Sequence, residues 1–243
     1  MPETMNVITI DGPSGVGKST ISRKIAQALG YTYLDTGAMY RAVGLYLVEN
    51  EIDLSDDLAV QGALENIRIE LLPSPGENDE SRVLLNGVDV SEAIRTPEMA
   101  MIASRVSALP LIRARLTALQ QDIGAEGCVV AEGRDTGTVV FPSARHKFFL
   151  DARPEERARR RVLQLRARGE AVDEQQIFQM TLERDKNDRE RAIAPLRQAE
   201  DALAIDTTNR DIEEVAALVL ESVKKGSLGR ECQPAGRCRC PTG

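Results

Sequence analysis

The feature that most constrains this chain is the segment Gly12–Ser19, GPSGVGKS, which fits the spacing G-x-x-x-x-G-K-[ST]. The β-rich run 6–10 precedes it, and Ile21 and Ile25 follow at helical spacing, so the segment connects an expected strand to an expected helix. Glycines in that position let backbone N–H groups converge on phosphate oxygens at a helix N-terminus. We therefore predict a phosphate-binding strand–loop–helix unit at the start of an α/β fold.

The chemistry of this loop can be stated residue by residue. Lys18 is expected to neutralise the β and γ phosphates of a bound triphosphate, and the Ser19 hydroxyl to hold Mg²⁺. The alternative, a glycine-rich turn with an incidental lysine, does not explain the strand before it and the helix after it. The predicted ATP-binding residues are Gly12, Pro13, Ser14, Gly15, Val16, Gly17, Lys18, Ser19 and Thr20.

The rest of the chain alternates between the two kinds of periodicity. Strands are expected at 31–34, 128–131, 147–150 and 202–205, and helices at 18–29, 39–50, 97–108, 111–123, 154–168, 173–189 and 212–224. Strands separated by helices indicate a parallel, doubly wound sheet. Residues 67–90 differ, because alternating apolar residues and the turn Asn86-Gly87 predict a small antiparallel insertion.

Charge limits the partners. The formal net charge is −7, which disfavours a protein that coats nucleic acid with a basic face. Seven arginines nevertheless lie between Asp151 and Glu170, and a locally basic segment in an acidic protein suits small anions.

We expect a cytoplasmic protein without membrane attachment. The stretch before Val7 is short and polar for a signal peptide, and no apolar run is long enough to span a bilayer. Cys128 reads as a small core residue. Cys232, Cys238 and Cys240 fall in a tail, 227–243, that we expect to be disordered, since no paired C-x-x-C spacing supports a zinc site there.

The phosphate loop does not identify an acceptor. The chain has no N-K-x-D motif of GTPases and no L-S-G-G-Q motif of transporters. A small-molecule kinase and a nucleotide sensor that transfers nothing both remain.

Longer motifs narrow this choice. They are ITIDGPSGVGKST, LDTGAMYRA, VSEAIRTPEMA, EGRDTGTVVFPSA, FFLDARPEERARRR, LERDKNDRERAIAPL and IDTT. With these motifs the chain resembles the bacterial cytidylate (CMP) kinases from about Val7 to Lys224. The EGRDTGTVVFP and RDKNDRERAIAPL runs weigh most, because adenylate and shikimate kinases lack them.

The resemblance implies a fold and a domain plan. The family has a P-loop nucleoside monophosphate kinase fold: five parallel strands flanked by helices, a small antiparallel β insertion in the monophosphate-binding region, and an arginine-rich lid. By resemblance, residues 1–226 form one domain, with the insertion at about 36–110 and the lid at about 153–170.

The resemblance also implies site residues. Thr36, Tyr40 and Arg41 would lie at the acceptor monophosphate, with Arg134 reaching its phosphate. Ser104, Arg113 and Asp135 would read the cytosine edge, Arg184 and Asp188 would hold the ribose, and Arg191 the phosphates. Lys18 and the lid arginines Arg157, Arg160 and Arg161 would act on the transferring phosphoryl group. Glu132 stands where some members have Asp, so its carboxylate is retained.

The chemistry of cytosine agrees with this set, because its exocyclic amine wants a carboxylate acceptor and its O2 and N3 want donors. Each assignment has a simpler alternative. Arg41 reads equally as a solvated helix residue, the run 157–161 as a solvated helix face, and Asp188 with Arg184 and Arg191 as a surface salt-bridge trio.

The resemblance therefore implies a (d)CMP kinase of pyrimidine metabolism that uses ATP with Mg²⁺ and binds no nucleic acid polymer. We expect a monomer, because the sequence has no obvious exposed apolar stripe. Two alternatives stay open: a kinase for UMP, AMP or a small alcohol, and the sensor.

Overall fold

The computed structural model describes residues 6–72 and 81–226. Their core is a five-stranded parallel sheet in the order β2-β6-β1-β7-β8. The strands are β1 (Val7–Asp11), β2 (Thr32–Asp35), β6 (Val129–Gly133), β7 (His146–Asp151) and β8 (Leu203–Asp206). The predicted parallel α/β sheet is confirmed. The Cys-bearing tail lies outside the described residues, so its expectation stays a prediction.

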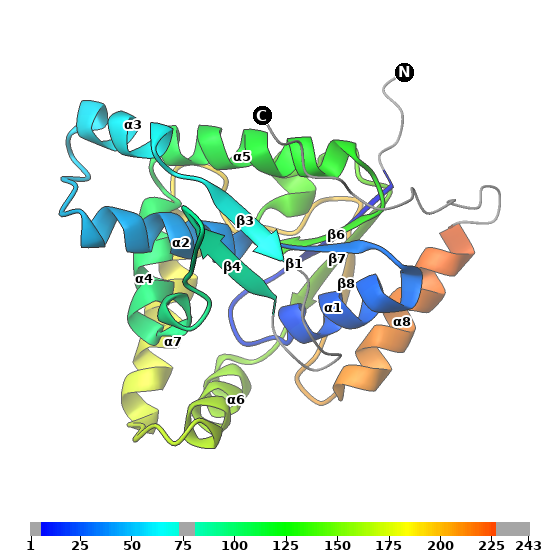
Figure 1. Ribbon diagram of the computed structural model, residues 1–243. Helices are drawn as coiled ribbons and strands as arrows, with labels where there is room; N and C mark the ends of the chain where they lie inside the picture. The colour runs from blue at the N-terminus through cyan, green and yellow to red at the C-terminus, as the bar shows by residue number, and fades with distance from the viewer. Residues whose placement is uncertain (1–5, 73–80, 227–243) are drawn as a thin grey trace.

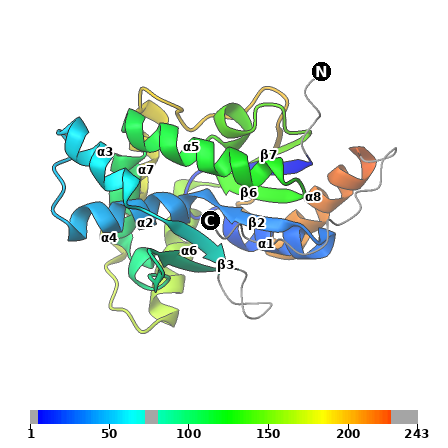
Figure 2. The same cartoon turned by 45° about the horizontal axis from the view of Figure 1, so that its top comes forward.

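Helices cover both faces of this sheet, as alternation along β1 requires (Figure 1). Val7 packs into one apolar cluster with α2 (Thr36–Glu49), α3 (Asp57–Glu65), α4 (Pro97–Val106) and α5 (Pro110–Ala125). Ile8 and Ile10 pack into the other with α1 (Lys18–Leu29) and α8 (Ile212–Gly226). Figure 2 shows the same two layers from a second side.

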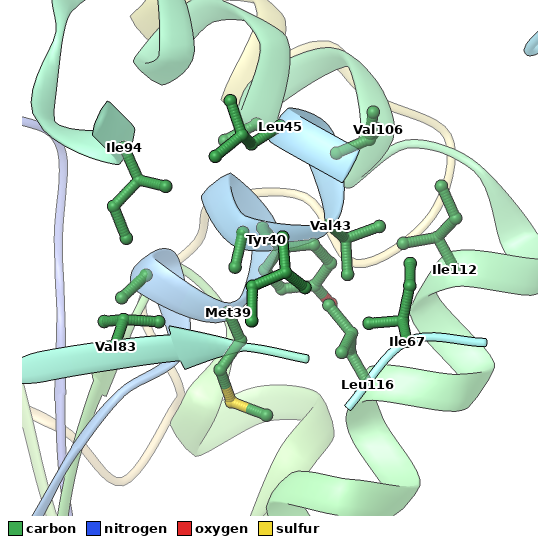
Figure 3. Packing of buried hydrophobic residues seen from close by; sticks show 14 of the residues in the cluster. Met39, Tyr40, Val43, Leu45, Ile67, Val83, Ile94, Val106, Ile112 and Leu116 are labelled. Atoms are coloured by element: carbon green, nitrogen blue, oxygen red, sulfur yellow. The ribbon is translucent and has the colours of Figure 1, made fainter. Parts of the chain in front are cut away.

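The first cluster packs helix α2 against helix α5. Met39, Tyr40 and Val43 of α2 point into it and meet Ile112 and Leu116 of α5 (Figure 3). Helix α2 begins at Thr36, three residues before the expected start at Met39, because the Asp35 side chain caps it by accepting from the Ala38 N–H. Helix α3, which the sequence reading missed, is short and capped by Asp56.

The predicted antiparallel insertion is confirmed as a second sheet, β3-β4-β5. Its strands are β3 (Ile69–Leu72), β4 (Arg82–Leu85) and β5 (Val88–Asp89), and Asn86-Gly87 forms the turn between the last two. Gly87 has a φ of 81° and Asn86 one of 51°, the left-handed values that make Asn-Gly a favourable turn pair.

A third, smaller cluster joins α6 (Pro154–Ala167) to α7 (Glu174–Glu190) through Val162, Leu165 and Ile177. These two helices extend away from the sheet beside the insertion (Figure 1). Short helical turns at Ala93–Arg95 (η1) and Thr136–Val140 (η2) complete the fold. No helix among the described residues is long and apolar enough to cross a membrane.

Candidate functional site

All five strands of the parallel sheet end in or beside a carboxylate at the same edge of the sheet. In the register, Asp11 of β1 lies beside Gly133 of β6, and Asp35 of β2 lies beside Glu132. Ligands of open α/β sheets bind outside the carboxyl ends of the strands, where the order of strands reverses. A cleft of about 580 Å³ lies there.

The phosphate loop forms one wall of this cleft. A Cβ on Gly12 would lie 2.0 Å from the Leu150 carbonyl oxygen, and one on Gly15 would lie 3.0 Å from Arg157 Cβ. Both positions therefore need glycine for the loop to pack against β7 and α6. The loop opens α1, whose first N–H groups face the cleft end of the sheet.

Lys18 is 7% exposed, and its ammonium donates to the Pro13 carbonyl at 2.6 Å. Burial and the neighbouring Arg134 lower the pKa of Lys18 well below its usual range. Burial disfavours the charged form of the lysine, and a nearby anion stabilises that form. A bound phosphate is such an anion.

Glu132 faces the same loop from β6. Its Oε1 accepts from the Ser19 hydroxyl at 2.7 Å and from the Tyr33 hydroxyl at 2.8 Å. Its Oε2 is buried and has no hydrogen-bond partner among the described residues. Burial, followed by the charge of Asp35, raises the pKa of Glu132. An orphaned carboxylate oxygen next to a Ser hydroxyl is a donor set that fits Mg²⁺ or its water ligands.

Asp135 also lines the cleft, where it binds two arginines. Its Oδ2 accepts from Arg113, and its Oδ1 accepts from Arg191 at 3.1 Å. Burial raises the pKa of this carboxyl, and the two arginines oppose that effect. Arg191 is fixed in turn by the Ser107 hydroxyl, and Arg113 lies 5.6 Å from the centre of the Tyr40 ring.

Asp188 holds a second arginine-rich position. It accepts from the Ser104 hydroxyl at 2.8 Å and from Arg134 at 2.9 Å. Burial alone would raise its pKa, but Arg134 and Arg184 outweigh that effect and hold the pKa at about 2. The carboxylate is therefore ionised at neutral pH, ready to accept hydroxyl or amine donors.

Two further arginines line the cleft between these carboxylates and the phosphate loop. Arg184 donates to the Ser14 hydroxyl at 3.1 Å, and burial together with Arg134 lowers its pKa to about 10. Arg41 pairs with Asp35 at 3.1 Å. Thr36 is buried, and its hydroxyl donates to the Glu132 carbonyl at 2.6 Å. Nine of the ten predicted acceptor residues line one cleft, and they come from α2, α4, α7 with its C-cap Arg191, and the loop after β6. The tenth, Arg113 of α5, is buried outside this lining and donates to Asp135, which does line the cleft.

The three predicted lid arginines occupy different environments. Arg157 is 1% exposed, and its guanidinium donates to both oxygens of Asp185 and to the Ser14 carbonyl. Arg160 donates to the Thr207 carbonyl at 2.6 Å. Thr207 lies next to the phosphate loop, since its hydroxyl donates to the Val16 carbonyl. Arg161 reaches the Arg95 carbonyl across the cleft at 3.3 Å. A phosphate contact by any of the three stays a prediction.

The structure adds residues that the sequence reading did not select. Tyr33 holds Glu132, Ser107 holds Arg191, Asp185 holds Arg157, and Asp11 holds the turn after Asp135. Of these, only Asp11 and Asp185 carried a sequence signal, since each lies inside a long motif next to a selected residue.

The comparisons with known proteins agree with this geometry. The family model described as cytidylate kinase matches residues 8–225. A cytidylate kinase of Carboxydothermus hydrogenoformans is 50% identical over 89% of this chain and 96% of its own length. Cytidylate kinases of Syntrophotalea carbinolica and Oleidesulfovibrio alaskensis are 48% and 46% identical, over 94% and 90% of this chain and 95% and 98% of their own lengths.

Proposed function

The chain belongs to the cytidylate kinase family, and from that membership we propose that it transfers the γ-phosphoryl group of ATP to CMP and dCMP. The observation that carries the choice of base is the buried Asp135 between Arg113 and Arg191. A carboxylate offers about four acceptor positions, so Asp135 can take the cytosine amine without releasing either arginine. Uracil would bring its O4 against the same carboxylate and be repelled.

We assign the donor to the phosphate loop and the acceptor to the opposite wall. An oxygen of the acceptor phosphate attacks the γ-phosphorus, the bond to the β–γ bridging oxygen breaks, and ADP leaves with that oxygen. Lys18 balances charge on the β and γ phosphates, while Arg41, Arg134 and Arg191 hold the acceptor phosphate. Arg184 and Asp188 hold the ribose. The acceptor is already anionic at neutral pH, so the step needs no protein nucleophile and no strong base.

We propose Ser19 and Glu132 as the residues that hold Mg²⁺, directly or through water. The metal, when bound, neutralises charge on the phosphates. Residues 36–110 would then form the acceptor-binding region and 153–170 the lid, whose closure over the cleft would exclude water.

The test measures ADP release from Mg·ATP with CMP, dCMP, UMP, AMP and no acceptor. Preference for CMP and dCMP supports the proposal. Activity with none of them favours a nucleotide sensor, and preference for UMP or AMP favours a kinase with another acceptor.

Two variants separate the halves of the site. Lys18→Ala should reduce turnover at least about 100-fold with every acceptor, because it acts on the donor phosphates. Asp135→Asn should reduce kcat/KM about 10- to 100-fold for CMP and less for UMP, since a hydrogen bond to a charged group is lost only for cytosine. Asp122→Asn, on an exposed position of α5, is the control. Equal losses for both acceptors in Asp135→Asn would remove the base-reading assignment.

A further inference from the structure

Asp11, the last residue of β1, is 4% exposed and does not line the cleft among the described residues. Its Oδ1 accepts from the Thr136 N–H at 2.9 Å and from the Thr136 hydroxyl at 2.8 Å. Its Oδ2 accepts from the Gly137 N–H at 2.7 Å. One buried carboxylate therefore holds three donors of one short segment.

That segment follows directly on the acceptor-reading residues. The chain leaves β6 at Gly133, presents Arg134 and Asp135 to the cleft, and then enters the turn 136–140. Because Asp11 fixes the two peptide N–H groups after Asp135, it fixes the direction in which the Arg134–Asp135 pair projects. The backbone at Gly137 is also closely packed, since a Cβ there would lie 2.9 Å from the Thr9 hydroxyl oxygen.

The other neighbour of Asp11 is the phosphate loop, which starts at Gly12. A Cβ on Gly12 would collide with the Leu150 carbonyl, so the backbone at Gly12 is fixed against β7. Asp11 thus belongs to the strand that leads into the donor site, and its carboxylate accepts hydrogen bonds from the segment that follows Arg134 and Asp135 of the acceptor site.

We propose that Asp11 is a positioning residue that sets Arg134 and Asp135 in register with the phosphate loop, and so sets the choice of acceptor base. This proposal rests on the proposed function. Asp11 touches neither substrate, so it acts through Thr136 and Gly137, and its loss should affect the acceptor while sparing the donor.

The principal variant is Asp11→Asn. It keeps the size of the side chain but turns one acceptor oxygen into an N–H₂ group, which would face a backbone N–H. We expect kcat/KM for CMP to fall about 10- to 100-fold, as for a lost bond to a charged acceptor. The ratio of kcat/KM for CMP over UMP should fall with it, while the Kd of Mg·ATP, measured by calorimetry without acceptor, stays within about 2-fold of wild type.

Thr136→Val is the milder second variant, which removes one of the three bonds and leaves both backbone bonds. It should lower the CMP-to-UMP ratio in the same direction and by less. Asp56→Asn is the matched control, because Asp56 also accepts from two backbone N–H groups, those of Leu58 and Ala59, but on exposed α3. It should leave the ratio and the Kd unchanged.

The proposal is overturned if Asp11→Asn weakens Mg·ATP as much as it weakens CMP, which would make Asp11 a general support of the fold. It is also overturned if neither variant changes the CMP-to-UMP ratio. Should Asp11→Asn fail to fold by circular dichroism, Thr136→Val alone decides. A wild-type protein without preference for CMP would contradict the proposed function itself, independently of every variant.

Discussion

At the scale of single residues, the ionisable groups of the cleft are defined by partners far away in the sequence. Asp188 illustrates this: a salt-bridge trio with its helix neighbours is the simpler alternative to a role in the site, but Arg184 Nε lies 4.0 Å away while Ser104 and Arg134 lie within 2.9 Å. The helix periodicity places the side chain on the right face. The choice of partner follows from how α7 packs against α4 and the loop after β6.

Asp11 gives a pH prediction at the same scale. Burial raises its pKa from 3.8 to about 6, against the Thr136 and Gly137 bonds, and the charge of Asp135 adds to the rise. Two cations lie near Asp11. The charge of Asp11 acts on the pKa of Lys18, and the Lys147 side chain packs against Gly137, to which Asp11 is bonded. The folded protein therefore binds more protons than the unfolded chain between these two pKa values, so this group's contribution to stability falls as pH rises through that window.

We expect that contribution to fall by about 3 kcal/mol between about pH 4 and pH 7, from 1.36 kcal/mol per pKa unit. Asp11→Asn cannot titrate, so its free energy of unfolding relative to wild type should rise by that amount over the same range. Urea unfolding of both proteins at several pH values measures the difference, and other carboxylates such as Glu132 cancel in it. A difference independent of pH would contradict the raised pKa.

At the scale of elements, one close helix contact shows which of two helical glycines matters. Helices α2 and α4 cross at Gly44, where a Cβ would lie 2.7 Å from Ile102 Cγ2. The contact brings α4, with Ser104, against the sheet side of the cleft. Gly62 of α3, in contrast, has nothing within 4 Å of such a Cβ.

Gly44→Ala should therefore destabilise the protein by about 1–2 kcal/mol, because overpacking outweighs the better helix propensity of Ala. Gly62→Ala, the matched control on an exposed helix, should stabilise it by up to about 1 kcal/mol. Adding Ile102→Ala to Gly44→Ala should recover part of the loss relative to the sum of the two single variants. Thermal unfolding of the wild type, the three single variants and the double variant measures these free-energy differences. Strict additivity of Gly44→Ala and Ile102→Ala would rule out their contact as the cause.

At the scale of the whole molecule, one buried ion pair connects three parts of the fold. Arg157 of α6 bonds Asp185 of α7 and the Ser14 carbonyl of the phosphate loop, and Arg184 next to Asp185 bonds the Ser14 hydroxyl. The α6–α7 unit is otherwise joined internally by a small apolar cluster. The pair therefore orients this unit relative to the donor site.

Arg157→Met should cost about 3–5 kcal/mol of stability, since it leaves Asp185 buried without its partner. The double variant Arg157→Met/Asp185→Leu should recover most of that cost, because an apolar pair of similar volume needs no desolvated charges. Turnover should stay low in both, as the Ser14 carbonyl has lost the Arg157 donor. Urea unfolding measures the effect on stability, and initial rates measure the effect on turnover. Full activity in the double variant would show that the pair serves stability alone.

The local patterns alone determined much of this protein. The phosphate loop, the parallel α/β order, the Asn86-Gly87 hairpin and the long motifs follow from spacings of a few residues, which backbone geometry translates directly into structure. The candidate site residues followed from the resemblance that these motifs carry, and the fold brings most of them to one cleft, with Arg113 behind it.

Only the tertiary structure decided how these groups are held. Arg157 was expected among solvated or phosphate-facing lid arginines, and the fold buries it against Asp185. Asp135 meets Arg113 and Arg191, and Asp11 meets Thr136 and Gly137, over separations in sequence that no periodicity encodes. Such pairs depend on the path of the whole chain, because a charge taken from water must find its partner wherever packing brings one.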